Sequence, residues 1–333
     1  MRTAPAKARI AVIGAGLMGH GIAQVFAIAG HDVTITDSFA QNLDTAKSRI
    51  AANLRDLGED ESALARLRPC ADLAEAVRDA DYVVEAVSED LPLKQKLFAE
   101  IERHVRRDTI LASNTSVIPI TAIMQNLTAR ERALGTHWWN PPFLVPLVEV
   151  IETKWTSPEA IAWTMELHTA AGKQPAHVKK DVPGFIGNRL QHALWREAIS
   201  LVEHGICDAQ TVDEVVKASF GRRLPVLGPL ENADLVGTDL TLAIHNIVLP
   251  AIDRRPGPSP YLQKLVADNK LGFKSGEGFR KWSADAQAAL RAKVMRHLKS
   301  MRDLSARHGR ACPGHPRLFA SRPRRGCPAQ GRA

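Results

Sequence analysis

Short apolar runs alternate with longer amphipathic stretches over the first half of the chain. Seven runs have the length and continuous apolar character of buried strands, at residues 8–13, 31–36, 81–87, 109–112, 133–135, 147–151 and 174–179. Stretches with helical periodicity lie among them, at residues 17–29, 43–57, 73–78, 93–105 and 158–171. This alternation predicts an α/β fold, in which a mostly parallel sheet is covered by helices on both faces.

The strand pattern stops near residue 182. Four later stretches, separated by Gly and Pro, have helical spacing, at residues 185–203, 209–220, 238–249 and 261–268. We therefore predict an α/β domain over residues 1–181 and an all-α C-terminal domain over residues 182–300. The segment 301–333 is rich in Arg, Pro and Gly and lacks apolar periodicity, which predicts disorder.

The composition is that of an ordinary globular protein, with 45% hydrophobic and 24% charged residues in a chain of 333. The formal net charge of +8 belongs mainly to the C-terminal segment. Residues 304–333 hold seven arginines and no acidic residue, so that residues 1–303 carry only +1. This near-balance, together with the absence of a recognised reading motif, argues against a nucleic-acid partner.

Membrane and metal partners are also not expected. No window approaches the roughly 20 uncharged apolar residues of a membrane helix, and no secretory signal pattern follows the first basic residues. The four cysteines are far apart and include no CxxC pair, which favours a cytoplasmic protein without a structural metal site.

A glycine-rich turn, GAGLMG at residues 14–19, joins the first predicted strand to the first predicted helix. In such a turn the first glycine permits a tight bend, the second lets backbone N–H groups approach a pyrophosphate, and the third lets helix and strand pack closely. We expect dinucleotide contacts from five residues of this turn: Gly14, Gly16, Leu17, Met18 and Gly19.

Asp37 stands 18 residues after Gly19, at the end of the second predicted strand. A carboxylate there accepts hydrogen bonds from both hydroxyls of an adenosine ribose and repels a 2′-phosphate. The turn and Asp37 together predict a Rossmann-type domain that binds NAD in preference to NADP. The alternative is a glycine-rich turn with Asp37 as a helix cap.

Three central segments carry candidate chemistry: SNTS at 113–116, THWWNPP at 136–142 and VEV at 148–150. Oxidation of a secondary alcohol requires a base for the hydroxyl proton, and imidazole suits that role near neutral pH. His137 is the candidate base. Glu149 lies within an apolar strand, where a charge needs a partner, and it would orient the ring and stabilise the imidazolium. Taken singly, His137 as a core histidine, Glu149 as a strand-edge charge and Ser116 as a helix cap remain open interpretations.

These motifs, in this order and at this spacing, resemble the 3-hydroxyacyl-CoA dehydrogenase family over about residues 10–282. The resemblance implies a catalytic group of Ser116, His137, Glu149 and Asn188, the last in GFIGNRL at 184–190. It also implies NAD contacts from six residues: Asp37, Glu89, Lys94, Ser116, Asn140 and Lys274. For the two lysines, a solvated surface position is the alternative.

The same resemblance implies NAD-dependent oxidation of the 3-hydroxyl of a 3-hydroxyacyl substrate, a CoA thioester first of all, and a homodimer formed through the helical domain. Two departures concern the substrate. Family members that act on CoA esters carry a Ser and a Lys on the helix after the second strand, where this chain has Asn53 and Asp60. An acidic residue beside a polyphosphate is unfavourable, although Lys47, Arg49 and Arg55 lie nearby as possible substitutes. The second departure is the Trp-Trp-Asn-Pro-Pro run after His137.

Related enzymes with similar cores act on free hydroxy acids. A second hypothesis is therefore the same chemistry on a gulonate-, carnitine- or hydroxypyridine-carboxylate-like substrate. A third is a non-catalytic, NAD-binding structural protein, as in the lambda-crystallin relatives. The joint presence of Ser116, His137, Glu149 and Asn188 counts against it, because a structural role needs none of their chemistry.

Overall fold

The structure is a computed structural model that describes residues 3–311. The chain divides into two compact units, residues 1–289 and residues 290–333. The first unit contains the whole sheet and helices α1–α11, and most of helix α12 belongs to the second. The sequence predicts disorder for residues 301–333. This prediction is wrong for residues 301–311, which form the end of α12. The remainder, residues 312–333, lies outside the described part of the chain.

One eight-stranded sheet organises the first unit, in the order β3-β2-β1-β4-β5-β6-β7-β8. All neighbouring strands are parallel except β6 and β7, which are antiparallel. The strands are β1 Ile10–Ile13, β2 Val33–Thr36, β3 Leu67–Pro69, β4 Tyr82–Glu85, β5 Ile110–Ser113, β6 Ala133–Trp138, β7 Leu147–Ile151 and β8 Gln174–Val178. This sheet confirms the predicted fold class.

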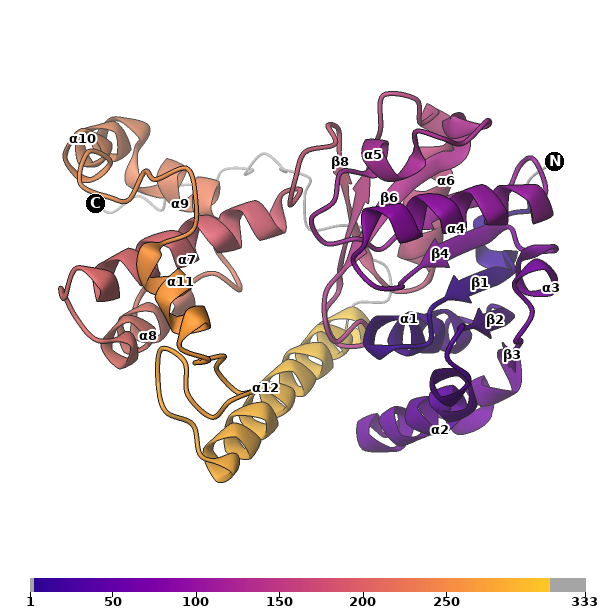
Figure 1. The fold of residues 1–333 in the computed structure, drawn as a ribbon, viewed down its shortest axis with the longest axis horizontal. Helices are drawn as coiled ribbons and strands as arrows, with labels where there is room; N and C mark the ends of the chain where they lie inside the picture. Colours follow the sequence, from indigo (N-terminus) through magenta and orange to yellow (C-terminus); the bar gives the residue numbers. More distant parts are fainter. Residues whose placement is uncertain (1–2, 312–333) are drawn as a thin grey trace, which may run out of the picture. The chain divides into compact units, whose positions relative to one another are not determined.

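Six helices flank the sheet (Figure 1). They are α1 Leu17–Ile28, α2 Ala40–Leu57, α3 Leu73–Val77, α4 Leu91–His104, α5 Ile120–Met124 and α6 Pro158–Ala170. Local chemistry sets several of their ends: Asp90 and Ser157 accept backbone N–H bonds as the N-caps of α4 and α6. Gly58 ends α2 in the left-handed conformation, with φ 66°.

Alternate residues of the buried strands face two separate hydrophobic clusters. In β1, Ile10 and Val12 join a cluster with α1, α2 and α6, whereas Ala11 and Ile13 join a cluster with α3, α4 and α5. This alternation is the period-two geometry of a strand that is covered on both faces. It explains why the strands are continuously apolar in sequence.

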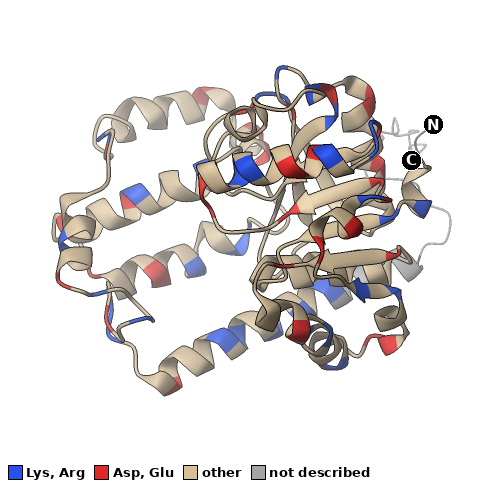
Figure 2. Ribbon diagram, turned by 45° about the vertical axis from the view of Figure 1, so that its right-hand side comes forward, with Lys and Arg blue, Asp and Glu red and all other residues tan. Residues whose placement is uncertain are grey.

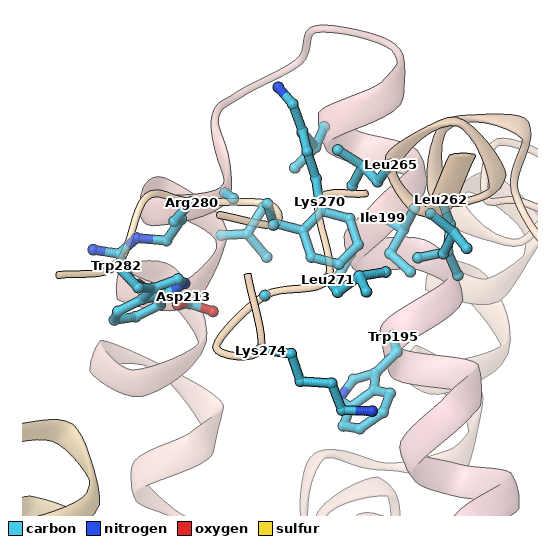
Figure 3. Close-up of a pocket in the computed structure, with 18 residues that line it drawn as sticks. Trp195, Ile199, Asp213, Leu262, Leu265, Lys270, Leu271, Lys274, Arg280 and Trp282 are labelled. Carbon is cyan, nitrogen blue, oxygen red and sulfur yellow. Dashed lines mark hydrogen bonds and ion pairs between the residues drawn. The ribbon is translucent and has the colours of Figure 1, made fainter. Parts of the chain in front are cut away.

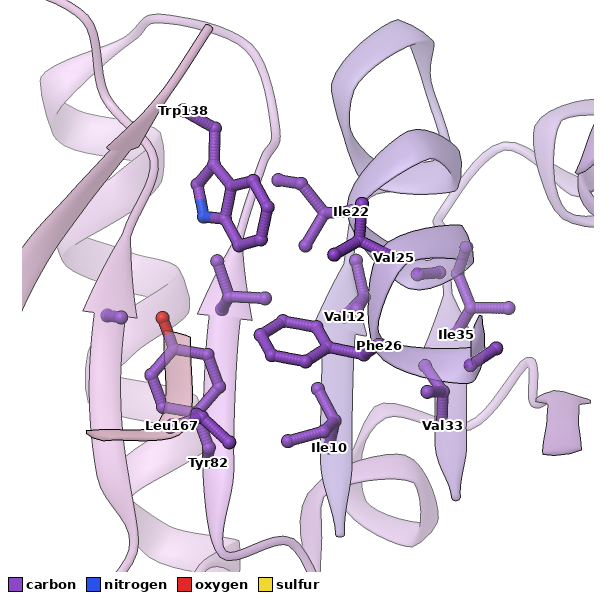
Figure 4. Packing of buried hydrophobic residues seen from close by; sticks show 14 of the residues in the cluster. Ile10, Val12, Ile22, Val25, Phe26, Val33, Ile35, Tyr82, Trp138 and Leu167 are labelled. Atoms are coloured by element: carbon purple, nitrogen blue, oxygen red, sulfur yellow. The ribbon is translucent and has the colours of Figure 1, made fainter. Parts of the chain in front are cut away.

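Phe26 is the central side chain of the first cluster (Figure 4). Its ring lies 5.6 Å from that of Trp138 and 5.9 Å from that of Tyr82, measured between centroids. These aromatic contacts join α1 to β4 and β6. They hold the first helix, and the glycine turn before it, in place on the sheet.

The rest of the first unit is helical. Its helices are α7 Gly187–Glu203, α8 Ala209–Ala218, α9 Pro229–Val236, α10 Thr238–Val248 and α11 Pro260–Ala267, and α12 follows at Ala284–Ala311. No helix in the described part of the chain is long and apolar enough to cross a membrane. Acidic and basic residues are interspersed along the helices and loops (Figure 2), as the near-balance of charge in residues 1–303 predicts.

Four elements are absent from the sequence prediction: β3, α5, α9 and α12. β3 has three residues and α5 has five, too few for a periodic signal. α9 has eight residues and begins at Pro229. These three short elements depend on the tertiary surface against which they pack. Shortness does not explain the omission of α12, which has 28 residues.

Candidate active site

The glycine turn combines two sites of close packing with one open site. Gly14 has φ 96°, and a Cβ there would lie 2.6 Å from the carbonyl oxygen of Ala86. A Cβ at Gly19 would lie 1.6 Å from the carbonyl oxygen of Gly14. At Gly16, by contrast, a Cβ would meet no atom within 4 Å. Packing therefore requires glycine at 14 and 19, while Gly16 leaves an open approach at the N-terminus of α1, where a pyrophosphate fits.

Asp37 lies beside this turn, directly after β2. Its Oδ2 accepts a hydrogen bond of 2.7 Å from the backbone N–H of Ala15 and one of 3.2 Å from Asn42 Nδ2. The carboxylate is thus held next to the open cradle at Gly16, as a ligand for ribose hydroxyls would be. Leu17 is 67% exposed and Met18 half-buried at the start of α1. The residues of the turn and Asp37 fit the adenosine side of NAD.

His137 and Glu149 form a buried pair across two strands. They are directly opposite each other in the antiparallel register of β6 and β7, and His137 Nδ1 lies 2.7 Å from Glu149 Oε2. Because a carboxylate only accepts, Nδ1 carries the hydrogen. In the neutral ring Nε2 is then the acceptor, and this is the nitrogen that a general base needs.

Glu149 is ionised in this environment. Burial raises the pKa of its carboxyl, but hydrogen bonds from His137 and from two backbone N–H groups outweigh burial and lower the pKa overall. The backbone donors are Ile186 and Gly187, at 2.9 and 3.0 Å from Oε1. One carboxylate therefore orients the imidazole and also holds the first residues of α7.

Ser116 and Asn188 meet at the same place. Ser116 follows β5 and is exposed, and its carbonyl oxygen accepts a hydrogen bond of 2.9 Å from Asn188 Nδ2 in the first turn of α7. Gly187, the preceding residue of the same helix, donates its N–H to Glu149. α7 thus connects Ser116 with the His137–Glu149 pair, so the structure brings the four predicted catalytic residues together through α7.

Glu89 and Lys94 lie in a network behind Ser116. Glu89 Oε1 accepts the backbone N–H of Ser116 at 2.9 Å, and the hydroxyl of Thr115 at 2.5 Å. Burial raises the pKa of Glu89, but these bonds and the charge of Lys94 lower it overall. Lys94 is only 1% exposed and lies 2.6 Å from Glu85 Oε1 and 3.4 Å from Glu89 Oε2. In this structure Lys94 supports the loop rather than facing solvent.

Sequence reasoning missed Glu85. It is fully buried at the end of β4, where it binds Lys94 through one oxygen and the hydroxyl of Ser113 through the other, at 2.6 Å in both cases. A signal was present, because Glu85 is an acidic residue within an otherwise apolar strand.

Two further predicted NAD contacts are Asn140 and Lys274. Asn140 is exposed after β6 and precedes a cis-proline, Pro141. Lys274 lines a pocket of about 610 Å³ in the helical region, where its side chain lies next to Trp195 (Figure 3). The pocket wall is mainly apolar and none of the four predicted catalytic residues belongs to it. No cluster of three or more potential metal ligands occurs among residues 3–311.

The open glycine cradle beside a carboxylate suits NAD, and an imidazole with an accepting Nε2 suits the proton of an alcohol. The fold and site together define an NAD-dependent dehydrogenase that acts on an alcohol. Comparison with protein families makes this specific. The chain belongs to the 3-hydroxyacyl-CoA dehydrogenase family: residues 9–182 match the model of its NAD binding domain and residues 184–282 that of its C-terminal domain.

Relatives of known function agree. The chain is 34% identical over 298 residues to 5-formyl-3-hydroxy-2-methylpyridine 4-carboxylate 5-dehydrogenase of Mesorhizobium japonicum, covering 88% of this chain and 96% of the relative. It is 38% identical over 290 residues to the human mitochondrial hydroxyacyl-coenzyme A dehydrogenase, covering 82% and 90%.

Solved structures give the same result. A crystal structure of the pyridine-carboxylate 5-dehydrogenase, described as an NAD+ dependent dismutase, has a TM-score of 0.83 at 34% identity and covers 90% of this chain and 98% of that one. An (S)-3-hydroxybutyryl-CoA dehydrogenase from Ralstonia eutropha has a TM-score of 0.70 at 31% identity, covering 83% and 99%. The predicted family, the NAD cofactor and the oxidoreductase class are confirmed.

Proposed function

We propose that His137 is the general base of this NAD-dependent dehydrogenase and that its reaction is oxidation of the 3-hydroxyl of a 3-hydroxyacyl substrate to the 3-keto compound. The observation that carries this proposal is the 2.7 Å hydrogen bond between His137 Nδ1 and Glu149 Oε2. It leaves Nε2 as the acceptor, and it places a carboxylate where positive charge develops when the ring takes a proton.

His137 Nε2 accepts the hydroxyl proton as the C–H bond of the same carbon breaks. Bound NAD supplies the acceptor for the hydride. Glu149 stays ionised and stabilises the imidazolium, while the ring contacts of His137 with Trp139 and Phe185 restrict its rotation. The proton on His137 and the hydride together account for the two hydrogens that the alcohol loses.

Ser116 and Asn188 hold the reacting oxygen in this proposal. Both occur at the junction between the sheet and α7, and the Asn188 amide is already fixed by its bond to the Ser116 carbonyl. Ser116 is exposed, and its hydroxyl would donate a hydrogen bond to the substrate oxygen. Positioning of this kind lowers the entropic part of the activation barrier.

The first substrate candidate is a 3-hydroxyacyl-CoA, supported by relatives such as the human enzyme. A second candidate, a free hydroxy acid, is supported by two side chains: Asn53 on α2, and Asp60, which lies beyond the end of that helix at Leu57 rather than on it. Asn53 Nδ2 donates to Gln24 Oε1 at 3.0 Å, and Asp60 caps a short 3-10 helix at Glu61–Arg66 by accepting the N–H of Ser62 at 2.8 Å. Neither side chain supplies a cation for a polyphosphate. The similarity to a pyridine-carboxylate dehydrogenase supports the same candidate.

One assay separates these candidates. NADH formation is followed with 3-hydroxybutyryl-CoA, longer 3-hydroxyacyl-CoAs, gulonate, carnitine and a hydroxypyridine carboxylate at equal concentrations. Turnover of the CoA thioesters supports the first candidate. Turnover of a free acid alone would contradict it and leave the His137 mechanism standing.

We also propose a homodimer formed through the helical region. None of the residues of α8, α9 or α10 is buried in the single chain. Four large apolar side chains of α9 and α10 are 63–79% exposed: Leu230, Leu235, Leu242 and Ile247. An apolar surface of this extent on helices is typical of a protein interface.

Light scattering at micromolar concentration tests the dimer. The expected mass is twice that of the 36.4 kDa chain. The double variant Leu242→Glu/Ile247→Glu places two charges on α10 and is expected to give the monomer. Lys96→Glu, at an exposed position of α4 outside the helical region, serves as a charge control. A monomeric wild-type protein would refute the proposal.

A further inference from the structure

The side chain of Arg49 reaches from α2 to the far side of the glycine turn. Its Nη2 donates to the carbonyl oxygen of Ala15 at 2.5 Å and to that of Asn42 at 2.8 Å. Its Nη1 lies 3.4 Å from the carbonyl oxygen of Gly16. A single guanidinium therefore binds carbonyl groups of two consecutive residues of the dinucleotide turn.

Ala15 is thereby held on both sides of its backbone. Its N–H donates to the carboxylate of Asp37, and its carbonyl accepts from Arg49. A carbonyl that turned toward a bound pyrophosphate would repel it, because both are negative at oxygen. The Arg49 bond fixes the carbonyl of Ala15 on the α2 side and so fixes the shape of the cradle. The Gly16 carbonyl, 3.4 Å from Arg49 Nη1, is held in addition by the N–H and the Nδ1 of His20.

Arg49 forms no ion pair with an acidic side chain. Among the side chains that the structure describes, no carboxylate oxygen lies within the 4.0 Å of an ion pair with Arg49, and its Nε is buried without a hydrogen-bond partner. Asp37 is linked to Arg49 only through Ala15 and Asn42, to which both side chains bind. The adjacent His20 does not offset this charge: its Nδ1 lies 2.7 Å from the carbonyl of Gly16 and therefore donates. A full positive charge lies behind the turn and adds to the positive N-terminus of α1.

We propose that Arg49 is a positioning residue for NAD: it holds the turn in its pyrophosphate-binding shape and supplies the positive charge behind it. The role concerns the pyrophosphate and is independent of the substrate that the enzyme oxidises. Arg49 is neither in the predicted NAD contacts nor in the predicted catalytic group.

The test uses ligands that share adenosine and differ in what is attached at its 5′ oxygen: nothing in adenosine, one phosphate in AMP, and a pyrophosphate with a second ribose in ADP-ribose. Displacement of bound NADH, followed by its fluorescence, gives the affinities of ADP-ribose, AMP and adenosine for the full-length protein and for Arg49→Gln. We expect Arg49→Gln to weaken ADP-ribose and NADH about tenfold or more, since charge-assisted bonds are lost. The loss for AMP should be smaller, and adenosine should bind as before.

Arg55→Gln is the matched control, because Arg55 is on the same helix, is 61% exposed and pairs with Glu61 outside the turn. It should leave all three ligands unchanged. Arg49→Lys keeps the charge but replaces the planar, forked guanidinium with a shorter side chain that ends in a single nitrogen. That nitrogen cannot occupy the positions of both Nη1 and Nη2, so the variant should weaken ADP-ribose severalfold. This variant decides the question if thermal unfolding shows that Arg49→Gln is not folded.

Two results would overturn the proposal. Equal loss of adenosine and ADP-ribose affinity would show that Arg49 only packs α2 against α1. Unchanged ADP-ribose affinity in a folded Arg49 variant would show that the turn keeps its shape and charge without it.

Discussion

Gly187 packs so closely against the indole of Trp139 that a Cβ at residue 187 would lie 2.4 Å from Cζ2 of the ring. The N–H of the same glycine donates to Glu149 Oε1. The start of α7 is thus placed by a ring that also contacts His137, with 5.3 Å between centroids. The geometry around the His137–Glu149 pair therefore depends on the absence of a side chain at residue 187.

The first prediction follows from this contact. Gly187→Ala must displace either Trp139 or the start of α7, which weakens the bond to Glu149 and moves Asn188. We expect kcat to fall by about tenfold or more, since small displacements at a reacting centre are costly, while NADH binding by fluorescence is unchanged. Gly257→Ala is the control, because a Cβ there meets nothing within 4 Å. Normal kcat in Gly187→Ala would show that the contact is tolerated.

The second prediction concerns the base. His137→Ala removes the acceptor of the hydroxyl proton, and turnover should fall by roughly two to four orders of magnitude. NADH affinity should be largely kept, because His137 is not among the residues of the cradle. Steady-state kinetics and NADH titration measure the two effects. Near-normal turnover would place the base elsewhere.

The third prediction concerns Glu149. Glu149→Gln keeps the size of the side chain but removes the charge opposite the imidazolium, so kcat should fall by about tenfold to a thousandfold. The same change at Glu152 provides a control, because Glu152 directly follows β7 and pairs at 2.8 Å with the half-exposed His177 on β8. A similar kcat loss in Glu152→Gln would indicate a general effect on β7 rather than a role of Glu149 in the pair.

The fourth prediction concerns the buried Glu85–Lys94 pair. Glu85→Gln leaves the ammonium of Lys94 buried beside one half-exposed carboxylate, so the free energy of unfolding should fall by about 3–5 kcal/mol. Urea denaturation measures this change. The exposed pair of Arg68 and Glu75 is the comparison, and Glu75→Gln should cost less than about 1 kcal/mol. Equal losses in the two variants would mean that burial does not matter here.

The fifth prediction concerns acid stability. Complete burial lowers the pKa of His168 to about 4, so the ring is neutral in the fold. Below its ordinary pKa of about 6.5 the unfolded chain binds a proton that the folded chain does not, and stability is lost as pH falls from 6.5 toward 4. The loss is at most about 1.4 kcal/mol for each pH unit.

Urea unfolding at pH 7, 6 and 5 tests this sign. His168→Phe places a similar ring among Phe26, Tyr82 and Trp138 and should lose this part of the pH dependence. An identical pH slope in the two proteins would assign the acid sensitivity to other groups.

The sequence by itself determined the glycine turn, the family and seven of the eight strands of the α/β half, but not the short β3 and α5. These features depend on periodicity and on residues close together in the chain. His137 and Glu149 were candidates from sequence, but their pairing required the antiparallel register of β6 and β7, which no local pattern specifies. Only the tertiary structure showed Lys94 buried against Glu85, and Arg49 behind a turn more than thirty residues earlier in the chain. The residues adjacent to a basic side chain in the sequence do not show whether that side chain is exposed or buried. Its role is decided by which distant backbone and carboxylate groups the fold brings within hydrogen-bonding distance.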